Sequence, residues 1–256
     1  MQIQRLNMDS SWWLQWQENQ WLIDPWLIGS EVDGFRWLNE QWHATEPVAL
    51  DRIPKADFIL VSQSYEDHCH PQTLEKLDEK LPIIASPKAF RKLKKAFPKR
   101  NIQEIPLWVK NEKPLTINNL HFFCLRPKKI LDPIYYGVLV YDSENQAIFY
   151  APHGFFPRPE EIQWLKNYTY KLLITTFSYF KIPEFMGGEV NPGLENARML
   201  ASLLQPQHIL NTHDEAKIMK GLVAQLAQAI YPDLGKIQKE ELDKLILSPD
   251  YQKITL

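Results

Sequence analysis

The chain has 256 residues, of which 45% are hydrophobic and 23% charged, and this composition excludes a disordered protein and indicates a globular one with a large core. Its 29 basic and 31 acidic side chains leave a formal net charge of −2, so no overall basic field favours binding to nucleic acid or to an anionic membrane. Two cysteines are too few for a disulfide framework, which favours a reducing, cytoplasmic location, and no apolar run is long enough to span a bilayer.

The first half of the chain is predicted to be rich in strands. Alternating apolar residues over 12–23 predict a β-hairpin with its turn at Glu18–Asn19. Short apolar runs typical of buried strands follow at residues 58–62 and 83–85. Proline near the first helical position predicts two helices, one over 71–80 and one that begins at Pro87 after the N-cap Ser86.

In the second half, strands give way to alternating strands and helices. Strands are predicted over residues 115–117, 121–125, 136–141, 147–150, 172–176 and 208–211. Helices are predicted over residues 159–168, 192–204, 214 to about 230, and 238–245. This mixture predicts an α/β or α+β sandwich in which helices cover sheets, built as a single domain over residues 1–256.

Metal-ligating residue types follow three of these strands. The loop after the 58–62 strand contains Asp67 and His68, while His153 and His213 come just after the strands that end near residues 150 and 211. Carboxylate and imidazole together suit zinc or another first-row metal, and loops at one edge of a sheet would bring them together. A solvated loop is the plainer reading of each motif alone. Within the first loop, Cys69 and His70 are rival ligands.

The order of these features resembles the metallo-β-lactamase-fold superfamily, in particular its sugar-lactonase-like, zinc-dependent hydrolase branch. The strand that ends in Asp24-Pro25 resembles the opening of that branch. Residues 61–68 (VSQSYEDH) resemble its Ser-His-x-His-x-Asp-His signature, and residues 209–213 (ILNTH) resemble the segment that ends in a metal-binding histidine. The resemblance implies a four-layer αβ/βα sandwich of two mixed β-sheets.

Departures from the family pattern fall on one of its two metal sites. Gln63 and Tyr65 stand where the first site has two histidines, and its third histidine should fall near Lys128 and Lys129. The second site of the family corresponds to four residues that can all bind metal, namely Asp67, His68, His153 and His213. The resemblance therefore implies a single divalent metal ion, which we take to be zinc, at the second position.

This reading implies a metal-dependent hydrolase that cleaves an ester, lactone or phosphoester of a small molecule by means of a metal-activated water. Asp67 would serve the catalytic centre as a ligand, Tyr65 could donate to a developing oxyanion, and Lys128 or Lys129 could hold an anionic substrate. The alternative is a non-catalytic pseudo-enzyme or binding protein of the same fold, whose metal is structural or absent. The substrate and the oligomeric state stay open.

Overall fold

The computed structural model describes residues 1–126, 135–240, 242–248 and 251–256, and the chain forms two compact units. Unit 1 comprises Met1–Ile105, Glu215–Gln225 and Ser248–Leu256, and unit 2 comprises Pro106–Asp214 and Leu226–Leu247. Each unit is therefore assembled from segments that are far apart in the sequence. The expectation of a single domain stays a prediction.

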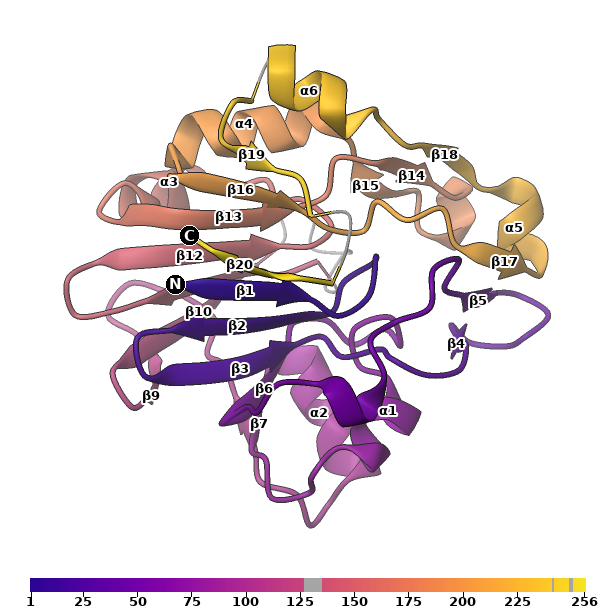
Figure 1. The fold of residues 1–256 in the computed structure, drawn as a ribbon, viewed down its shortest axis with the longest axis horizontal. Helices are drawn as coiled ribbons and strands as arrows, with labels where there is room; N and C mark the ends of the chain where they lie inside the picture. The colour runs from indigo at the N-terminus through magenta and orange to yellow at the C-terminus, as the bar shows by residue number, and fades with distance from the viewer. Residues whose placement is uncertain (127–134, 241, 249–250) are drawn as a thin grey trace. The chain divides into compact units, whose positions relative to one another are not determined.

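The large sheet of unit 1 has, among the residues described, seven strands in the order β20-β1-β2-β3-β6-β7-β8 (Figure 1). Its strands are β1 (Gln2–Arg5), β2 (Trp12–Trp16), β3 (Asn19–Ile23), β6 (Phe58–Val61), β7 (Ile83–Ala85), β8 (Ile102–Glu104) and β20 (Lys253–Thr255). The pairings β20-β1-β2-β3 are antiparallel and β3-β6-β7-β8 are parallel, so the sheet is mixed. Parallel pairing places the carboxyl ends of β3 and β6 at one edge.

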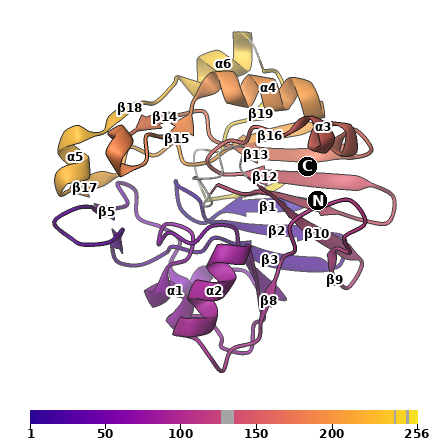
Figure 2. The ribbon, with the colours of Figure 1, turned by 180° about the vertical axis from the view of Figure 1, so that it is seen from behind.

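Helices cover one face of this sheet. Helix α1 (Pro71–Lys76) and helix α2 (Pro87–Ala96) bury Leu74, Ala89 and Leu93 in a core with Ile59 and Val61 of β6 (Figure 2). A 3-10 helix, η1, spans Leu50–Arg52, and a small sheet in the order β17-β5-β4 joins Ile218–Lys220, Glu40–Trp42 and Glu31–Val32. This small sheet ties a late segment of the chain to the first unit.

Unit 2 repeats this plan. In the described part of the chain its large sheet has the order β19-β16-β13-β12-β11-β10-β9. Its strands are β9 (Leu115–Ile117), β10 (Leu120–Leu125), β11 (Gly137–Tyr141), β12 (Gln146–Ala151), β13 (Thr169–Thr175), β16 (His208–Asn211) and β19 (Leu245–Ile246). Pairings from β9 to β12 are antiparallel and those from β12 to β19 are parallel.

The helices of unit 2 also pack on one face of their sheet. Leu165, Leu200 and Ile237 come from three helices and share a core with Phe149 and Leu173 of the sheet. These helices are α3 (Pro159–Leu165), α4 (Leu194–Leu204) and α6 (Leu234–Glu240). The remaining elements are β14 (Tyr179–Lys181), η2 (Glu184–Met186), β15 (Glu189–Pro192) and β18 (Gln228–Ile230) of unit 2, with α5 (Leu222–Leu226) in unit 1. Two large mixed sheets with helices confirm the expected mixed α/β class.

Three local expectations were wrong. The helix expected over 238–245 is instead α6 (Leu234–Glu240), and Leu245 already belongs to strand β19. The hairpin turn lies at Gln17–Glu18, one residue earlier than expected, because Trp16 pairs with Asn19 and Gln17 takes up the left-handed conformation with φ 55°. The helix expected over 214–230 is divided into β17, α5 and β18. Gly221, at φ 98°, breaks it: a Cβ at this position would lie 2.7 Å from the carbonyl oxygen of Leu38.

Candidate metal centre

The loop after β6 presents Asp67 and His68 as neighbours in a tight turn. The carbonyl of Tyr65 accepts hydrogen bonds from the backbone N–H groups of His68 (3.1 Å) and Cys69 (2.7 Å). His68 is fully buried and Asp67 nearly so, and Nε2 of His68 lies 3.5 Å from Oδ2 of Asp67. The turn therefore directs an imidazole nitrogen and a carboxylate oxygen to the same place.

Asp24 holds the ring of His68. Its Oδ2 lies 2.7 Å from Nδ1 of His68, and its Oδ1 accepts a hydrogen bond of 2.6 Å from the backbone N–H of Ser62. Burial alone would lower the pKa of His68, but the carboxylates of Asp67 and Asp24 outweigh it and raise that pKa. Because the Asp24 carboxylate accepts a hydrogen bond from the Nδ1–H group of His68, Nε2 is the ring nitrogen suited to a metal. From the sequence, Asp24 was recognisable only as the residue at which a strand ends.

The rival ligands in this loop have other roles. His70 is the N-cap of α1: its Nδ1 accepts a hydrogen bond from the backbone N–H of Thr73 (3.2 Å), and its Nε2 lies 3.2 Å from the carbonyl oxygen of Ser30. Burial raises the pKa of the Cys69 thiol to about 12, so it is not a thiolate at neutral pH. Neither Cys69 nor His70 is therefore as well suited to bind a metal ion as Asp67 and His68 are.

Unit 2 brings His153 and His213 together. Strands β12, β13 and β16 are parallel neighbours, with Ala151, Thr175 and Asn211 in register at their ends, and each histidine follows two residues after its strand. The two buried rings stack with their centroids 4.5 Å apart and their planes inclined by 23°. The shared sheet edge predicted from the sequence is therefore present for this pair.

A chain of hydrogen bonds supports the two histidines. Nδ1 of His153 lies 2.8 Å from Oδ1 of Asn191, whose Nδ2 donates to Oγ of Ser178 (3.0 Å). Ser178 in turn donates to the carbonyl oxygen of His213 (2.8 Å). A helix was expected to begin at Asp214, but none does. Asp214 instead accepts a hydrogen bond from the backbone N–H of Ser178 (2.8 Å).

The remaining residues named from the sequence lie in the same loop after β6 or outside the described residues. Tyr65 contributes its backbone to the turn, and 38% of its surface is exposed. Gln63, which stands at a lost ligand position, is fully buried. Lys128 and Lys129 lie outside the described residues.

Unit 1 also buries an ammonium group that the sequence did not single out. Nζ of Lys217 lies 3.0 Å from Oδ2 of Asp9 and 3.9 Å from Oε1 of Glu31, and its side chain is 13% exposed. Burial disfavours the charge, but Asp9, Glu31 and Asp67 outweigh burial and raise the pKa of Lys217. The pKa of Glu31 is also raised, first by burial and then by repulsion from Asp33 and Asp67. Lys217 is thus the counter-ion of an acidic cluster that includes a predicted metal ligand.

Asp33 gives this cluster a testable pH dependence. Burial, and then the carboxylate of Asp67, raise its pKa from 3.8 to about 7. Between these values the folded chain binds more protons than the unfolded chain, so the contribution of Asp33 to stability falls as pH rises. In metal-free protein, Asp33→Asn should raise the melting temperature at pH 8 by at least about 2–4 °C, the effect of ~1 kcal/mol in a chain of this size.

The gain from Asp33→Asn should shrink as pH falls from 7 towards 4, since the native carboxyl then becomes neutral. Thermal unfolding of both proteins at several pH values, in the presence of a chelator, measures the difference. Asp57→Asn is a suitable comparison, because it also replaces a carboxylate in unit 1, one that accepts from the backbone N–H of Gln20 at an exposed position. A gain that stays constant across this pH range would contradict the prediction.

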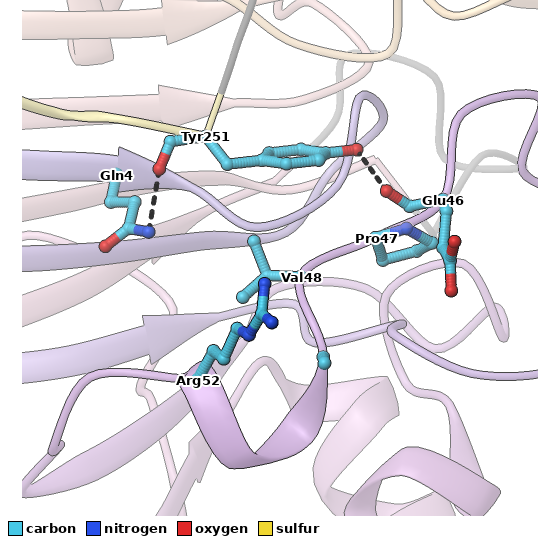
Figure 3. A pocket seen from close by; sticks show the side chains of 7 residues that line it. Gln4, Glu46, Pro47, Val48, Arg52 and Tyr251 are labelled. Carbon is cyan, nitrogen blue, oxygen red and sulfur yellow. Dashed lines mark hydrogen bonds between the residues drawn. The ribbon is translucent and has the colours of Figure 1, made fainter.

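A separate cavity of about 510 Å³ lies in unit 1 (Figure 3). It is lined by Gln4, Glu46, Pro47, Val48, Ala49, Arg52 and Tyr251. The hydroxyl of Tyr251 donates to the carbonyl oxygen of Glu46 (2.8 Å), and Nε2 of Gln4 donates to the carbonyl oxygen of Tyr251 (2.8 Å). This cavity includes none of the predicted ligands.

Comparison with known proteins identifies the fold. The family described as "Beta-lactamase superfamily domain" matches residues 5–161. A possible metal-dependent hydrolase from Veillonella parvula is 15% identical with a TM-score of 0.74, and covers 100% of this chain and 99% of its own. An isothiocyanate hydrolase from Delia radicum gut bacteria is 16% identical with a TM-score of 0.68, over 100% of this chain and 99% of its own.

A shorter sequence match involves a much larger protein. The cytidine monophosphate-N-acetylneuraminic acid hydroxylase of Danio rerio is 34% identical over 67 residues, which are 26% of this chain and only 11% of that protein. Among the residues described, no helix combines the length and the hydropathy that crossing a membrane requires. The structural likenesses, together with the family match, confirm the expected metallo-β-lactamase fold.

Proposed function

Because the chain belongs to the β-lactamase superfamily, whose metallo-β-lactamase fold is that of metal-dependent hydrolases, we propose that it is a hydrolase with one divalent metal ion held by Asp67, His68, His153 and His213. All four residues are buried. Three neutral imidazoles and one carboxylate form a donor set that suits zinc. When bound, such an ion supplies Lewis acidity that activates water for attack on an ester, lactone or phosphoester.

The observation that carries this proposal is the way two of the imidazoles are held. His68 and His153 each direct Nδ1 to a buried oxygen acceptor, Asp24 in one case and Asn191 in the other. Metal-binding histidines characteristically engage a carboxylate or carbonyl oxygen through the nitrogen that does not bind the metal. Any buried histidine needs a hydrogen-bond partner, but Nε2 of His68 also lies 3.5 Å from Oδ2 of Asp67, a second predicted ligand, and this supports a metal-binding role.

The protein's own residues have further roles under this proposal. Asp24 and Asn191 orient the two rings, and Tyr65, with its partly exposed side chain, is the proposed donor to the oxyanion. Lys128 and Lys129 are the proposed cations for an anionic group of the substrate. A small molecule is the proposed substrate, and nucleic acid is not.

Metal analysis of the purified chain tests the proposal. We expect at most one equivalent of divalent metal per chain, because Gln63 and Tyr65 offer no imidazole or thiolate for a second ion. Elemental analysis after dialysis gives the stoichiometry, and His121→Ala is the control, since His121 lies within β10 and its Nδ1 is 3.0 Å from the hydroxyl of Thr116. Two equivalents of bound metal would overturn the single-ion proposal.

A non-catalytic protein of the same fold is the second candidate, and the burial of Gln63 at a lost ligand position favours it. Four protein ligands on a tetrahedral ion leave no position for water, as in structural zinc sites, whereas the hydrolase requires a fifth coordination position that admits water. The two candidates differ in their activity towards ester, lactone and phosphoester substrates. Hydrolysis that depends on added metal and is lost in His68→Ala supports the enzyme, whereas one tightly bound ion without hydrolysis supports the structural role.

A further inference from the structure

We propose that Asn191 is a positioning residue that fixes the tautomer of His153 and so directs Nε2 of that ring to the metal. This inference rests on the proposed function, because it takes His153 as a ligand. Asn191 lies in β15, pairs with Phe180 of β14 and is 5% exposed. Its side chain is the polar neighbour of Nδ1 of His153, at 2.8 Å.

The orientation of the Asn191 amide follows from its other partner. Ser178 Oγ donates its one proton to the carbonyl oxygen of His213, so towards Asn191 this hydroxyl oxygen is an acceptor. The NH₂ group of Asn191 must therefore face Ser178, and its carbonyl oxygen must face His153. A carbonyl oxygen only accepts, so Nδ1 of His153 carries the proton and Nε2 keeps its lone pair.

The same chain of bonds reaches the second histidine of unit 2. Ser178 holds the backbone of His213, which adopts the left-handed conformation with φ 55°. Asn191 and Ser178 thus set the ring of His153 and the backbone of His213 through one buried connection. The two rings stack at 4.5 Å, so a shift in one ring would disturb the other.

Asn191 also differs from Asp24 in charge. The ring of His68 is held by a carboxylate, which makes Nε2 of that ring a more basic metal ligand. The ring of His153 is held by a neutral amide. Of the two proposed imidazole ligands, one therefore has a charged hydrogen-bond partner, Asp24, and the other an uncharged one, Asn191. An amide adds no negative charge to the site, which leaves a bound ion more electrophilic than a second carboxylate would.

Two substitutions at one position test this role. Asn191→Leu removes the acceptor at similar volume and should weaken Zn²⁺ binding by ~10–100-fold, the usual cost of losing a residue that orients a metal-binding histidine. Asn191→Asp keeps the acceptor towards His153 but loses the amide donor to Ser178, so it should bind Zn²⁺ more tightly than Asn191→Leu. Competition with a chromophoric chelator measures the dissociation constants. Asn167→Leu, at an exposed position after α3, is the matched control and should bind normally.

A spectroscopic measurement reports the tautomer of His153 directly, in the unmodified chain and in Asn191→Leu. In metal-free protein labelled with ¹⁵N-histidine, His153 should show the tautomer protonated at Nδ1, and Asn191→Leu should lose that preference. Wild-type His153 protonated only at Nε2 would overturn the inference, as would an Asn191→Leu variant that folds and binds Zn²⁺ with unchanged affinity. Rescue must also be specific: an Asn191→Asp variant as weak as Asn191→Leu would overturn it.

His153→Ala separates this inference from the proposed function. Loss of metal in His153→Ala together with full binding in Asn191→Leu would refute the role of Asn191 and keep His153 as a ligand. Full metal binding in His153→Ala would instead refute the proposed ligand set itself.

Discussion

Replacement of His213 by alanine should remove most of the bound metal while the fold survives. His213 is the last of the four proposed ligands in the sequence, and a residue that only orients a ligand already costs ~10–100-fold in affinity, so the loss of a ligand should cost more. The sheets are held together by their apolar cores, which the substitution does not touch. Alanine carries a Cβ as histidine does, so the left-handed backbone at this position (φ 55°) should cost the variant little more strain than it costs the unmodified chain. Any hydrolysis should disappear with the metal.

Elemental analysis and circular dichroism of His213→Ala, compared with His121→Ala, measure the two effects separately. A His213→Ala protein that keeps its full metal load would refute the proposed centre. An experimental structure in which the imidazoles of His68 and His213 lie more than about 5 Å apart would refute it too, because two zinc–nitrogen bonds of ~2.0–2.1 Å cannot span a greater distance.

Replacement of Lys217 by methionine should cause the largest loss of stability in unit 1. The ammonium lies between buried carboxylates, 3.0 Å from Asp9 and 3.9 Å from Glu31. Removal of one partner of a buried ion pair leaves uncompensated charge and typically costs about 3–5 kcal/mol. We expect that loss in denaturant unfolding of the metal-free protein at pH 8. It should be smaller at lower pH, where the carboxylates can take up protons.

Lys220→Met provides the matched control, since Lys220 is exposed and its ammonium lies 5.0 Å from the ring centroid of Trp42. Its effect should stay below about 1 kcal/mol. A second variant isolates the charge: Lys217→Met combined with Asp9→Asn should regain part of the lost stability. If Lys217→Met unfolds no more easily than Lys220→Met, the ammonium is not the counter-ion of this cluster.

The sequence was most informative where a pattern is local. The apolar run at β6 and the proline-started helices α1 and α2 are close to where the pattern placed them. The sequence pattern failed over residues 214–230, where helical propensity was overridden. Ile218–Lys220 pairs with β5, and Ile218 stands opposite Trp42, which comes 176 positions earlier. Such pairing depends on which edge strand is free to accept a partner, and a single sequence carries no signal for that.

In the site, too, the residues marked by a local sequence pattern could be predicted and the others could not. Asp67, His68, His153 and His213 could be selected because each follows an apolar strand and is of a metal-ligating type. Asn191 and Lys217 could not, because an asparagine in a short edge strand and a lysine before another have no distinguishing pattern. Their roles depend on side chains that meet only in the folded chain. Asp24 is intermediate, since the Asp-Pro pair marked the strand end but not its bond to His68.

The pairing of β20 with β1 has a consequence for how the protein is made. Gln2 pairs with Thr255 and Gln4 with Lys253, so this edge of the sheet can close only after the chain has been synthesised as far as residue 255 (Figure 1). Until then β1 keeps an open backbone edge, which is the kind of surface on which nascent chains associate with one another. Contacts between such distant residues also carry a large loop-closure cost and slow folding. We therefore expect unit 1 to stay incomplete until residue 255 has left the ribosome, and chaperones to bind the unpaired edge of β1 until then.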